Sequence, residues 1–189
     1  MSDLDTSVLI VCRDDEEHVG HLIRRVAGHL AALELRYEIL LFDEGSGDNS
    51  LALLSLLKRE LPQLDVFAGV DEGRGFVRGA ELARGRTLLL LDARSEAPFS
   101  AVGFALQRIR EGADAVIVAG RYLVLHRIRA LRAHDTLVHH RDTLELERRF
   151  VRRARSLGLE VAVAARPSPP TPWARIRNTL LSPIASSAR

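Results

Sequence analysis

In this chain of 189 residues, three apolar runs are each followed by acidic residues. These acids are Asp14, Asp43, Glu44 and Asp92. At the end of a strand, a carboxylate can accept hydrogen bonds from a nucleobase, bind a divalent cation, or take a proton from a hydroxyl group. Arg13 and Arg94 stand within two residues of these acids. A guanidinium group binds phosphate through a fork of donors. These residue types point to a site for a phosphate-bearing ligand, provided that the fold brings them together.

The elements that would position these residues alternate between strands and helices. Continuous apolar runs typical of buried strands cover residues 7–12, 37–42, 64–68, 87–91 and 115–119. Helical spacing of apolar residues covers 19–33, 51–57, 76–84 and 98–109, and a weaker pattern predicts a helix at 143–157 and a strand at 159–164. The alternation predicts an α/β fold, a three-layer sandwich with a mostly parallel sheet, whose ligands lie beyond the carboxyl ends of the strands.

Composition narrows the class of protein. Apolar residues make up 47% of the chain and charged residues 28%, as in globular proteins. No apolar run approaches the length of a membrane span, and the start of the chain has no apolar stretch typical of a secretory signal, so we expect a cytoplasmic protein. The single cysteine, Cys12, excludes an internal disulfide and a multi-cysteine metal site.

Basic residues concentrate in the last third of the chain. Residues 121–189 hold 14 arginines and five acids, whereas residues 1–120 hold 13 basic and 20 acidic residues. The basic third predicts contact with an anionic membrane surface or an acidic protein partner, or else neutralisation of the two parts within one fold. With 5% aromatic residues and no base-stacking motif, the sequence does not predict binding of nucleic acid.

Five segments stand in an order that identifies a family. They are residues 8–16 (VLIVCRDDE), 37–48 (YEILLFDEGSGD), the glycine-rich 73–75 with 79–85, 92–94 (DAR) and 111–122 (EGADAVIVAGRY). Together they resemble the family-two glycosyltransferases, and within them the polyprenyl-phosphate mannose synthases, over residues 7–122. The resemblance implies the A-type nucleotide-sugar transferase fold, and transfer of a sugar from a UDP- or GDP-sugar to a lipid phosphate or another acceptor.

The resemblance also implies roles for individual residues. Asp43 or Glu44 would bind the base, and Val11, Arg13 and Asp14 stand where the family has a proline, an aromatic residue and an asparagine. Donor binding by an arginine would fall to Arg74 or Arg78. The catalytic base would come from Asp142 or Glu145, although these two residues also fit a capping arrangement at the start of a helix.

The Asp92-Ala93-Arg94 segment departs from the family, whose second acid in this motif holds a divalent cation such as Mn²⁺ or Mg²⁺. Arg94 cannot ligate a metal. It could instead contact the diphosphate directly, or Glu96 could supply the missing ligand beside the catalytic Asp92. Alternatively, Arg94 pairs with Asp92 or Glu96 and the chain is an inactive module that binds a protein or senses a nucleotide.

The sequence also predicts how the chain is divided. Residues 1–165 would form the transferase-like domain, with a nucleotide-binding half at 7–122 and a reduced acceptor half at 123–165. Residues 166–189 would form a Pro-rich linker and a short amphipathic tail that either lies on a membrane or docks on protein. Two histidine pairs, 18/21 and 139/140, have spacing that a metal could use, but without a third fixed ligand such pairs are more often surface residues.

Overall fold

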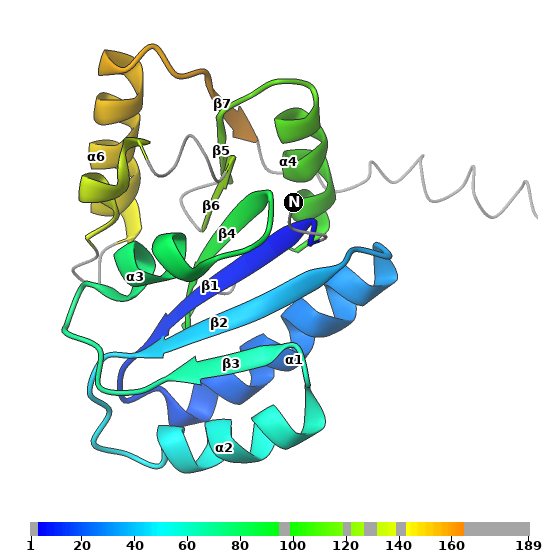
Figure 1. Ribbon diagram of the computed structural model, residues 1–189, viewed down its shortest axis with the longest axis vertical. Helices are drawn as coiled ribbons and strands as arrows, with labels where there is room; N and C mark the ends of the chain where they lie inside the picture. The colour runs from blue at the N-terminus through cyan, green and yellow to red at the C-terminus, as the bar shows by residue number, and fades with distance from the viewer. Residues whose placement is uncertain (1–3, 95–98, 119–121, 127–131, 139–142, 165–189) are drawn as a thin grey trace, which may run out of the picture.

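A computed structural model describes residues 4–94, 99–118, 122–126, 132–138 and 143–164, which form one sheet with helices on both faces (Figure 1). The strands are β1 (Thr6–Cys12), β2 (Tyr37–Asp43), β3 (Leu64–Phe67), β4 (Thr87–Asp92), β5 (Ala115–Val118), β6 (Tyr122–His126) and β7 (Val161–Ala164). The helices are α1 (Glu16–Ala32), α2 (Ser50–Glu60), α3 (Gly75–Leu82), α4 (Ser100–Arg110), the 3₁₀ turn η1 (His134–Leu137) and α6 (Thr143–Ser156).

The sheet has seven strands in the order β3-β2-β1-β4-β6-β5-β7. Strands β3, β2, β1 and β4 pair in parallel, as do β5 and β7, whereas β6 runs antiparallel to both of its neighbours, β4 and β5. The predicted α/β fold with a mostly parallel sheet is confirmed. Strand β6 is an addition to the prediction, because the sequence pattern after residue 121 gave no strand there.

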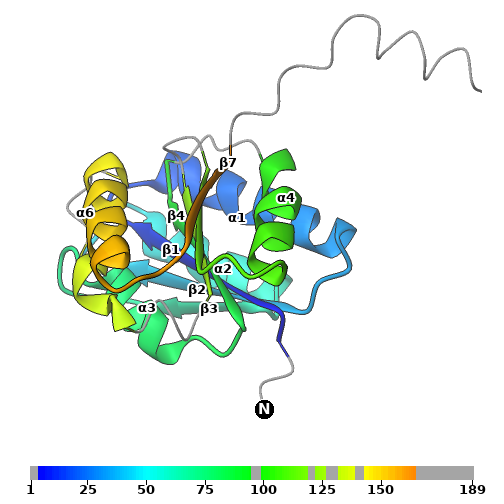
Figure 2. The same ribbon diagram turned by 90° about the horizontal axis from the view of Figure 1, so that it is seen from above.

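Two apolar layers hold the helices on the sheet, and Figure 2 shows the helices on its two sides. Helices α1, α2 and α4 pack on one face, against side chains such as Val8, Ile10 and Leu41. Helices α3 and α6 pack with η1 on the other face, against side chains such as Leu9 and Phe42. Burial on both faces explains why the central strands read as continuous apolar runs rather than as alternating ones.

An ion pair between a buried carboxylate and an exposed arginine lies at the amino edge of the sheet. The Glu38 carboxylate accepts hydrogen bonds from the Ser7 hydroxyl at 2.6 Å and from the Arg84 backbone N–H at 2.7 Å. The Arg84 guanidinium adds two contacts to the second oxygen, 2.7 Å from Nε and 2.6 Å from its terminal nitrogen. Ser7 in turn accepts the Gly85 N–H at 2.8 Å, so every polar group of this network has a partner.

The predicted division into a transferase-like domain and a tail stays a prediction, since residues 165–189 lie outside the described part of the chain. The predicted boundary between the two halves, at residues 122 and 123, falls within β6, and β6 lies between β4 and β5 in the sheet. Within the described ranges, no helix combines the length and the apolar character needed to cross a bilayer.

Candidate functional site

Four loops meet at the carboxyl edge of the sheet, as the parallel strands require. In the register of the sheet, Cys12 lies opposite Asp43, and Val11 lies opposite Asp92. Side chains of paired residues share a face of the sheet. Asp92 therefore shares the face of Val11, on which α3 packs, whereas Asp43 shares the face of Cys12, on which α1 packs. The loops converge, but these two acids project from opposite faces.

Hydrogen bonds between side chains and backbone join the loops after β1 and β2. Asp14 accepts the Gly47 N–H at 2.7 Å, and its own N–H donates to the Ser46 hydroxyl at 3.0 Å. Glu16 accepts the N–H of Asn49 at 2.8 Å, while its own N–H donates to Asp48 at 3.0 Å. Asp14 holds this position with a positive φ of 54°. The bonds fix the two loops against each other.

The Asp43 carboxylate is fully buried and is used inside its own turn. It accepts the N–H groups of Gly45 at 3.3 Å and Ser46 at 3.2 Å, and also the Ser46 hydroxyl. The Cys12 thiol lies 3.7 Å from the same carboxylate. Burial raises the pKa of the Cys12 thiol, and the charges of Asp43 and Asp15 raise this pKa further, so the thiol stays protonated.

Glu44 joins the β2 loop to the start of α3. Its buried carboxylate accepts the N–H of Gly73 at 2.9 Å and that of Gly75 at 3.0 Å. A Cβ atom at position 75 would lie 2.5 Å from the Val11 side chain and 3.0 Å from the Glu44 carboxylate. The glycine-rich segment is thus explained by a carboxylate cradle and by close packing of the helix on β1, where Val11 is buried.

Arg94 forms an ion pair with Asp15, which links the β4 loop to the β1 loop. The Arg94 Nε lies 2.5 Å from Asp15 Oδ1, and the Arg94 N–H donates to Asp92 at 2.9 Å. The other oxygen of Asp15 accepts the N–H of Arg13 at 2.9 Å. The hydrogen bond to Asp15 and the negative charge of Asp15 raise the pKa of Arg94, so the guanidinium stays charged. Among the described residues, the ion pair of the Arg94 guanidinium is with Asp15, whereas Glu96 lies outside the described part of the chain.

The Arg13 side chain extends toward the loop before α3, where it pairs with Glu72. Its Nε is buried and has no hydrogen-bond partner in the described part of the chain. A buried donor without a partner is unusual in a folded protein. Arg13 therefore brings an unused donor to the meeting point of the β1 and β3 loops.

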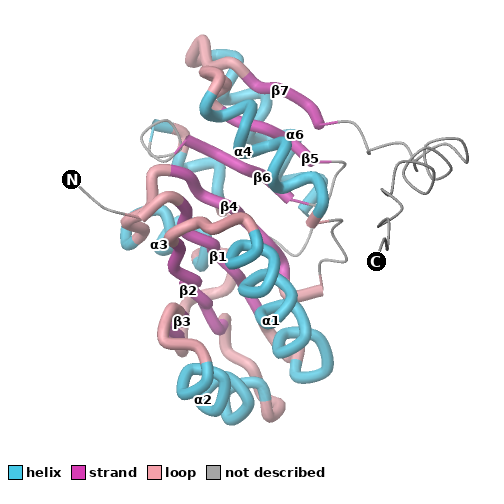
Figure 3. Tube along the Cα trace, turned by 90° about the vertical axis from the view of Figure 1, so that its right-hand side faces the viewer, coloured by secondary structure: helices cyan, strands magenta, loops and turns pink. Residues whose placement is uncertain are grey.

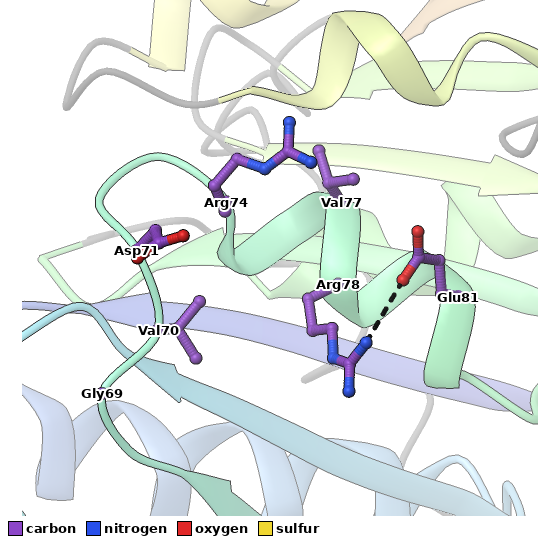
Figure 4. Close-up of a pocket in the computed structure, with 7 residues that line it drawn as sticks. All are labelled: Gly69, Val70, Asp71, Arg74, Val77, Arg78 and Glu81. Atoms are coloured by element: carbon purple, nitrogen blue, oxygen red, sulfur yellow. Dashed lines mark ion pairs between the residues drawn. The ribbon is translucent and has the colours of Figure 1, made fainter.

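Arg74 and Arg78 line a cavity of about 340 Å³ between the β3 loop and α3 (Figure 4). The two side chains point away from each other, and Arg78 forms an ion pair with Glu81 at 3.6 Å (Figure 4). Arg74 and Arg78, the two candidates for the donor-binding arginine, thus line the same cavity, but their side chains do not converge on one position in it.

A second hollow lies between α1 and the loop after β4. His18, His21, Arg25 and Arg94 line about 320 Å³ there, together with Glu17 and Leu22. Among the described residues, no group of three or more His, Cys, Asp or Glu side chains is arranged to hold a metal ion. The histidine pair at 18 and 21 is therefore not joined by a third ligand within that part of the chain.

Several predicted site residues fall outside this description. Asp142, Glu96 and the second histidine pair lie outside the described residues. Glu145 belongs to the first turn of α6, and its side chain is not described. Conversely, Asp15 is central to the site although nothing in the sequence distinguished it from its neighbours Asp14 and Glu16. Its partner Arg94 is 79 residues away along the chain.

Comparison with known proteins places the chain in a family. The sequence profile described as Glycosyl transferase family 2 matches residues 7–168. An uncharacterized glycosyltransferase of Synechocystis sp. is 26% identical over 124 residues, which are 62% of this chain and 38% of that protein. An undecaprenyl-phosphate 4-deoxy-4-formamido-L-arabinose transferase of Pseudomonas fluorescens is 29% identical over 114 residues, 58% of this chain and 33% of that protein. The matched part of the chain covers about a third of the length of each of these two relatives.

Solved structures share the fold at low sequence identity. The mannosyltransferase PcManGT from Pyrobaculum calidifontis, in complex with GDP-Man and Mn²⁺, has a TM-score of 0.70 at 12% identity, over 93% of this chain and 61% of that chain. Glucosyl-3-phosphoglycerate synthase from Mycobacterium tuberculosis, in complex with Mn²⁺, UDP and phosphoglyceric acid, has a TM-score of 0.61 at 14% identity, over 88% of this chain and 72% of that chain. The fold is that of the nucleotide-diphospho-sugar transferases, and with a family profile that covers most of its length, the chain belongs to glycosyl transferase family 2.

Proposed function

We propose that the carboxyl edge of the sheet binds a nucleotide-diphospho-sugar, with UDP or GDP as the nucleotide, and transfers its sugar to a lipid phosphate or another acceptor. The observation that carries this proposal is the Arg94–Asp15 pair at the meeting point of the loops. Family membership supports it, and so does the P. fluorescens relative, which is named as an undecaprenyl-phosphate transferase.

Arg94 is positioned to contact the diphosphate. Asp15 engages only its Nε, and no described residue forms a hydrogen bond with its two terminal nitrogens. A guanidinium held at Nε keeps a fixed plane, and its terminal nitrogens suit two oxygens of a phosphate. Its charge is retained because Asp15 raises its pKa.

The described residues do not fit a divalent cation at this point. Arg94 stands where the family has the second acid, its backbone N–H occupies one oxygen of Asp92, and its side chain occupies one oxygen of Asp15. A hard cation needs several free oxygen ligands. We therefore assign the positive charge beside the diphosphate to Arg94, and no step of the reaction is assigned to a metal.

For the base, Asp43 and Glu44 keep the roles that the family resemblance implies. Both carboxylates already accept hydrogen bonds within the protein, Asp43 from the N–H of Ser46 in its own loop and Glu44 from the N–H of Gly73 in the loop after β3. Each would therefore have to exchange an internal hydrogen bond for one from the base. Arg13 is the second candidate for the base or the ribose, since its Nε has no partner. Asp142 and Glu145 remain the proposed sources of the catalytic base.

The same ion pair also favours a second candidate function. Arg–carboxylate pairing is a stable end state for a site that has lost its acid, and catalysis needs the full set of charges in place. In this alternative, the chain is a transferase-like module without activity that binds a nucleotide or a protein.

Thermal unfolding with UDP or GDP, each with and without Mn²⁺, tests the proposal. We expect a nucleotide to raise the melting temperature without Mn²⁺, because a ligand that binds only the folded state stabilises it. A shift that requires Mn²⁺ would contradict the assignment to Arg94 and would point to Glu96 or a histidine. A lack of any shift with either nucleotide would contradict nucleotide binding.

Arg94→Asp restores the family's acid and sharpens the test. We expect this variant to need Mn²⁺ for the nucleotide shift, whereas Arg59→Asp, on the exposed part of α2, should behave as the natural chain does. Transfer or hydrolysis across a panel of nucleotide sugars then separates the two candidate functions. Loss of turnover in Asp92→Ala supports the enzyme, and binding without turnover supports the inactive module.

A further inference from the structure

A groove at the far margin of the sheet lies between α6 and strand β5, next to the edge strand β7. Its lining residues, here called the arginine groove, are Ile117, Arg148, Val151, Arg152 and Arg155, and its volume is about 500 Å³. Val163 lies opposite Ile117 in the sheet register, so the two side chains share the face on which α6 packs. Val163 is 71% exposed, which makes it the most exposed large apolar residue of the described chain.

Three arginines face the groove from one side of α6. Arg148, Arg152 and Arg155 are spaced by four and three residues, which places them on one helical face. All three are exposed, and no hydrogen bond or ion pair with a described residue engages their side chains. The groove therefore combines an apolar floor with three positive charges that the described part of the protein leaves uncompensated.

Strand β7 offers backbone groups beside this floor. It is the last strand in the sheet order and pairs with β5 on one side only (Figure 3). No described residue pairs with its outer edge. Its sequence, VAVA, contains no charge, although natural edge strands are usually protected by charged residues or by a covering segment. An uncharged edge beside exposed apolar surface is a surface to which another strand can add.

Charge decides between the candidate occupants. The chain's own segment 166–189 contains no aspartate or glutamate and three arginines besides its terminal Arg189, so it would be repelled by the groove. A second copy that paired β7 with β7 would bring one row of arginines toward the other. An occupant with carboxylates suits all three arginines.

We propose that the arginine groove binds an extended acidic segment of a partner protein, which adds to the edge of β7. In an added strand, every second side chain faces α6, and acids at those positions would meet Arg148, Arg152 and Arg155. The main chain of the segment would pair with the outer edge of β7, which no described residue engages, and its side chains would cover Val163. A flat membrane surface could reach the arginines but would not fill a groove of about 500 Å³.

The groove is separate from the proposed nucleotide site. Strand β7 lies three strands beyond β4, the strand that carries Asp92. That separation is about 14 Å at the usual spacing between strands. The inference does not rest on the proposed function, and saturating UDP or GDP should leave binding of the acidic segment unchanged.

Fluorescence anisotropy of the full chain with a labelled synthetic peptide of alternating glutamate and valine tests the proposal. We expect binding that weakens about tenfold or more in Arg152→Glu, as for loss of a charge pair at an interface. Arg59→Glu makes the same charge change on α2 and should leave the affinity unaltered. A peptide with glutamine in place of glutamate should bind much more weakly, and so should one with N-methyl groups on alternate amides, which removes donors to β7.

Other results would overturn the proposal. They include equal binding of the glutamine peptide, an unchanged affinity in Arg152→Glu, and binding only to vesicles that contain phosphatidylglycerol, which would assign the arginines to a membrane. Peptide binding that appears only in Trp173→Ala would assign the groove to the chain's own tail. A dimer in sedimentation that the peptide cannot dissociate would assign it to a second copy.

Discussion

Two buried carboxylates at opposite edges of the sheet are each paired with an arginine that is more than half exposed. At the amino edge, the Glu38 side chain is 4% exposed and that of Arg84 64%. At the carboxyl edge, the corresponding values are 6% for Asp15 and 57% for Arg94. Burial alone does not distinguish the two pairs. They differ in which nitrogen atoms of the guanidinium contact the carboxylate.

At the amino edge, Glu38 uses both oxygens and Arg84 uses both Nε and a terminal nitrogen. At the carboxyl edge, Arg94 contacts Asp15 through Nε alone. One pair is complete within the protein, and the other holds a charged group in place with its terminal nitrogens unengaged by described residues. The number of engaged donors, rather than burial, therefore distinguishes the structural pair from the candidate binding pair.

Removal of Glu38 should have the largest effect on stability. Glu38→Ala leaves the Ser7 hydroxyl and the backbone N–H of Arg84 without their acceptor, and each buried donor left unpaired costs about 1–3 kcal/mol. Urea unfolding followed by circular dichroism measures this loss. The exposed control Glu81→Ala removes a surface pair with Arg78 and should lose about 0–1 kcal/mol. Equal losses in the two variants would contradict a structural role for the Glu38–Arg84 pair.

Gly75→Ala tests how tightly the carboxyl edge is packed. The new Cβ would meet the Val11 side chain at 2.5 Å and Phe42 Cβ at 3.0 Å, and neither can move without shifting a central strand. Overpacking of this kind costs about 1–3 kcal/mol. Gly28→Ala in α1 is the matched control, because no atom lies within 4 Å of its Cβ. That control should gain about 0.5–1 kcal/mol in urea unfolding, and a loss there would contradict the packing argument.

Arg94→Ala should separate binding from stability. Its removal takes one charge-assisted hydrogen bond from the buried Asp15 carboxylate, at a cost of about 1–3 kcal/mol, but should abolish the thermal shift produced by UDP or GDP. Arg84→Ala should do the reverse, with a larger loss in urea unfolding and an intact nucleotide shift. If Arg94→Ala proves the more destabilising of the two and still responds to nucleotide, the distinction between the edges is wrong.

The smallest effect concerns His29, near the end of α1 and outside both pairs. Burial lowers the pKa of His29 below 6.5, and its Nε2 is buried without a partner among the described residues. The unfolded chain therefore binds a proton more readily than the folded chain. This contribution to stability is complete above a pH of about 6.5 and is lost as the pH falls through that value toward the lower, folded pKa. Urea unfolding between neutral and mildly acidic pH should show a shallower loss for His29→Met than for the natural chain, and equal slopes would contradict this account.

Most of the fold could be predicted because burial on both faces of the sheet leaves its mark in local sequence. The strands from Thr6 to Val118 and helices α1 to α4 appear as apolar runs and helical patterns within about three residues of their bounds. Strand β6 could not be placed, because its pairing with β4 and β5 depends on a reversal of direction that periodicity does not encode.

The candidate site was predictable as a set of loops but not as a set of contacts. Glu44 holds Gly73 and Gly75, which are 29 and 31 residues away, and Asp15 holds Arg94 at a separation of 79 residues. A sequence reports which residue types stand at the ends of strands. It does not report which of two adjacent acids, Asp14 or Asp15, turns inward, since that depends on the positive φ of Asp14.

Cys12 gives the molecule a built-in reporter of opening. It is the single thiol of the chain, it is buried at the end of β1, and burial together with Asp43 raises its pKa. Alkylating reagents react with thiolates, so the rate of labelling of the native protein reads out how often the central strands separate. Because Cys12 lies where the β1 and β2 loops join, a bound nucleotide that clamps those loops would be visible as slower alkylation, without any label on the ligand.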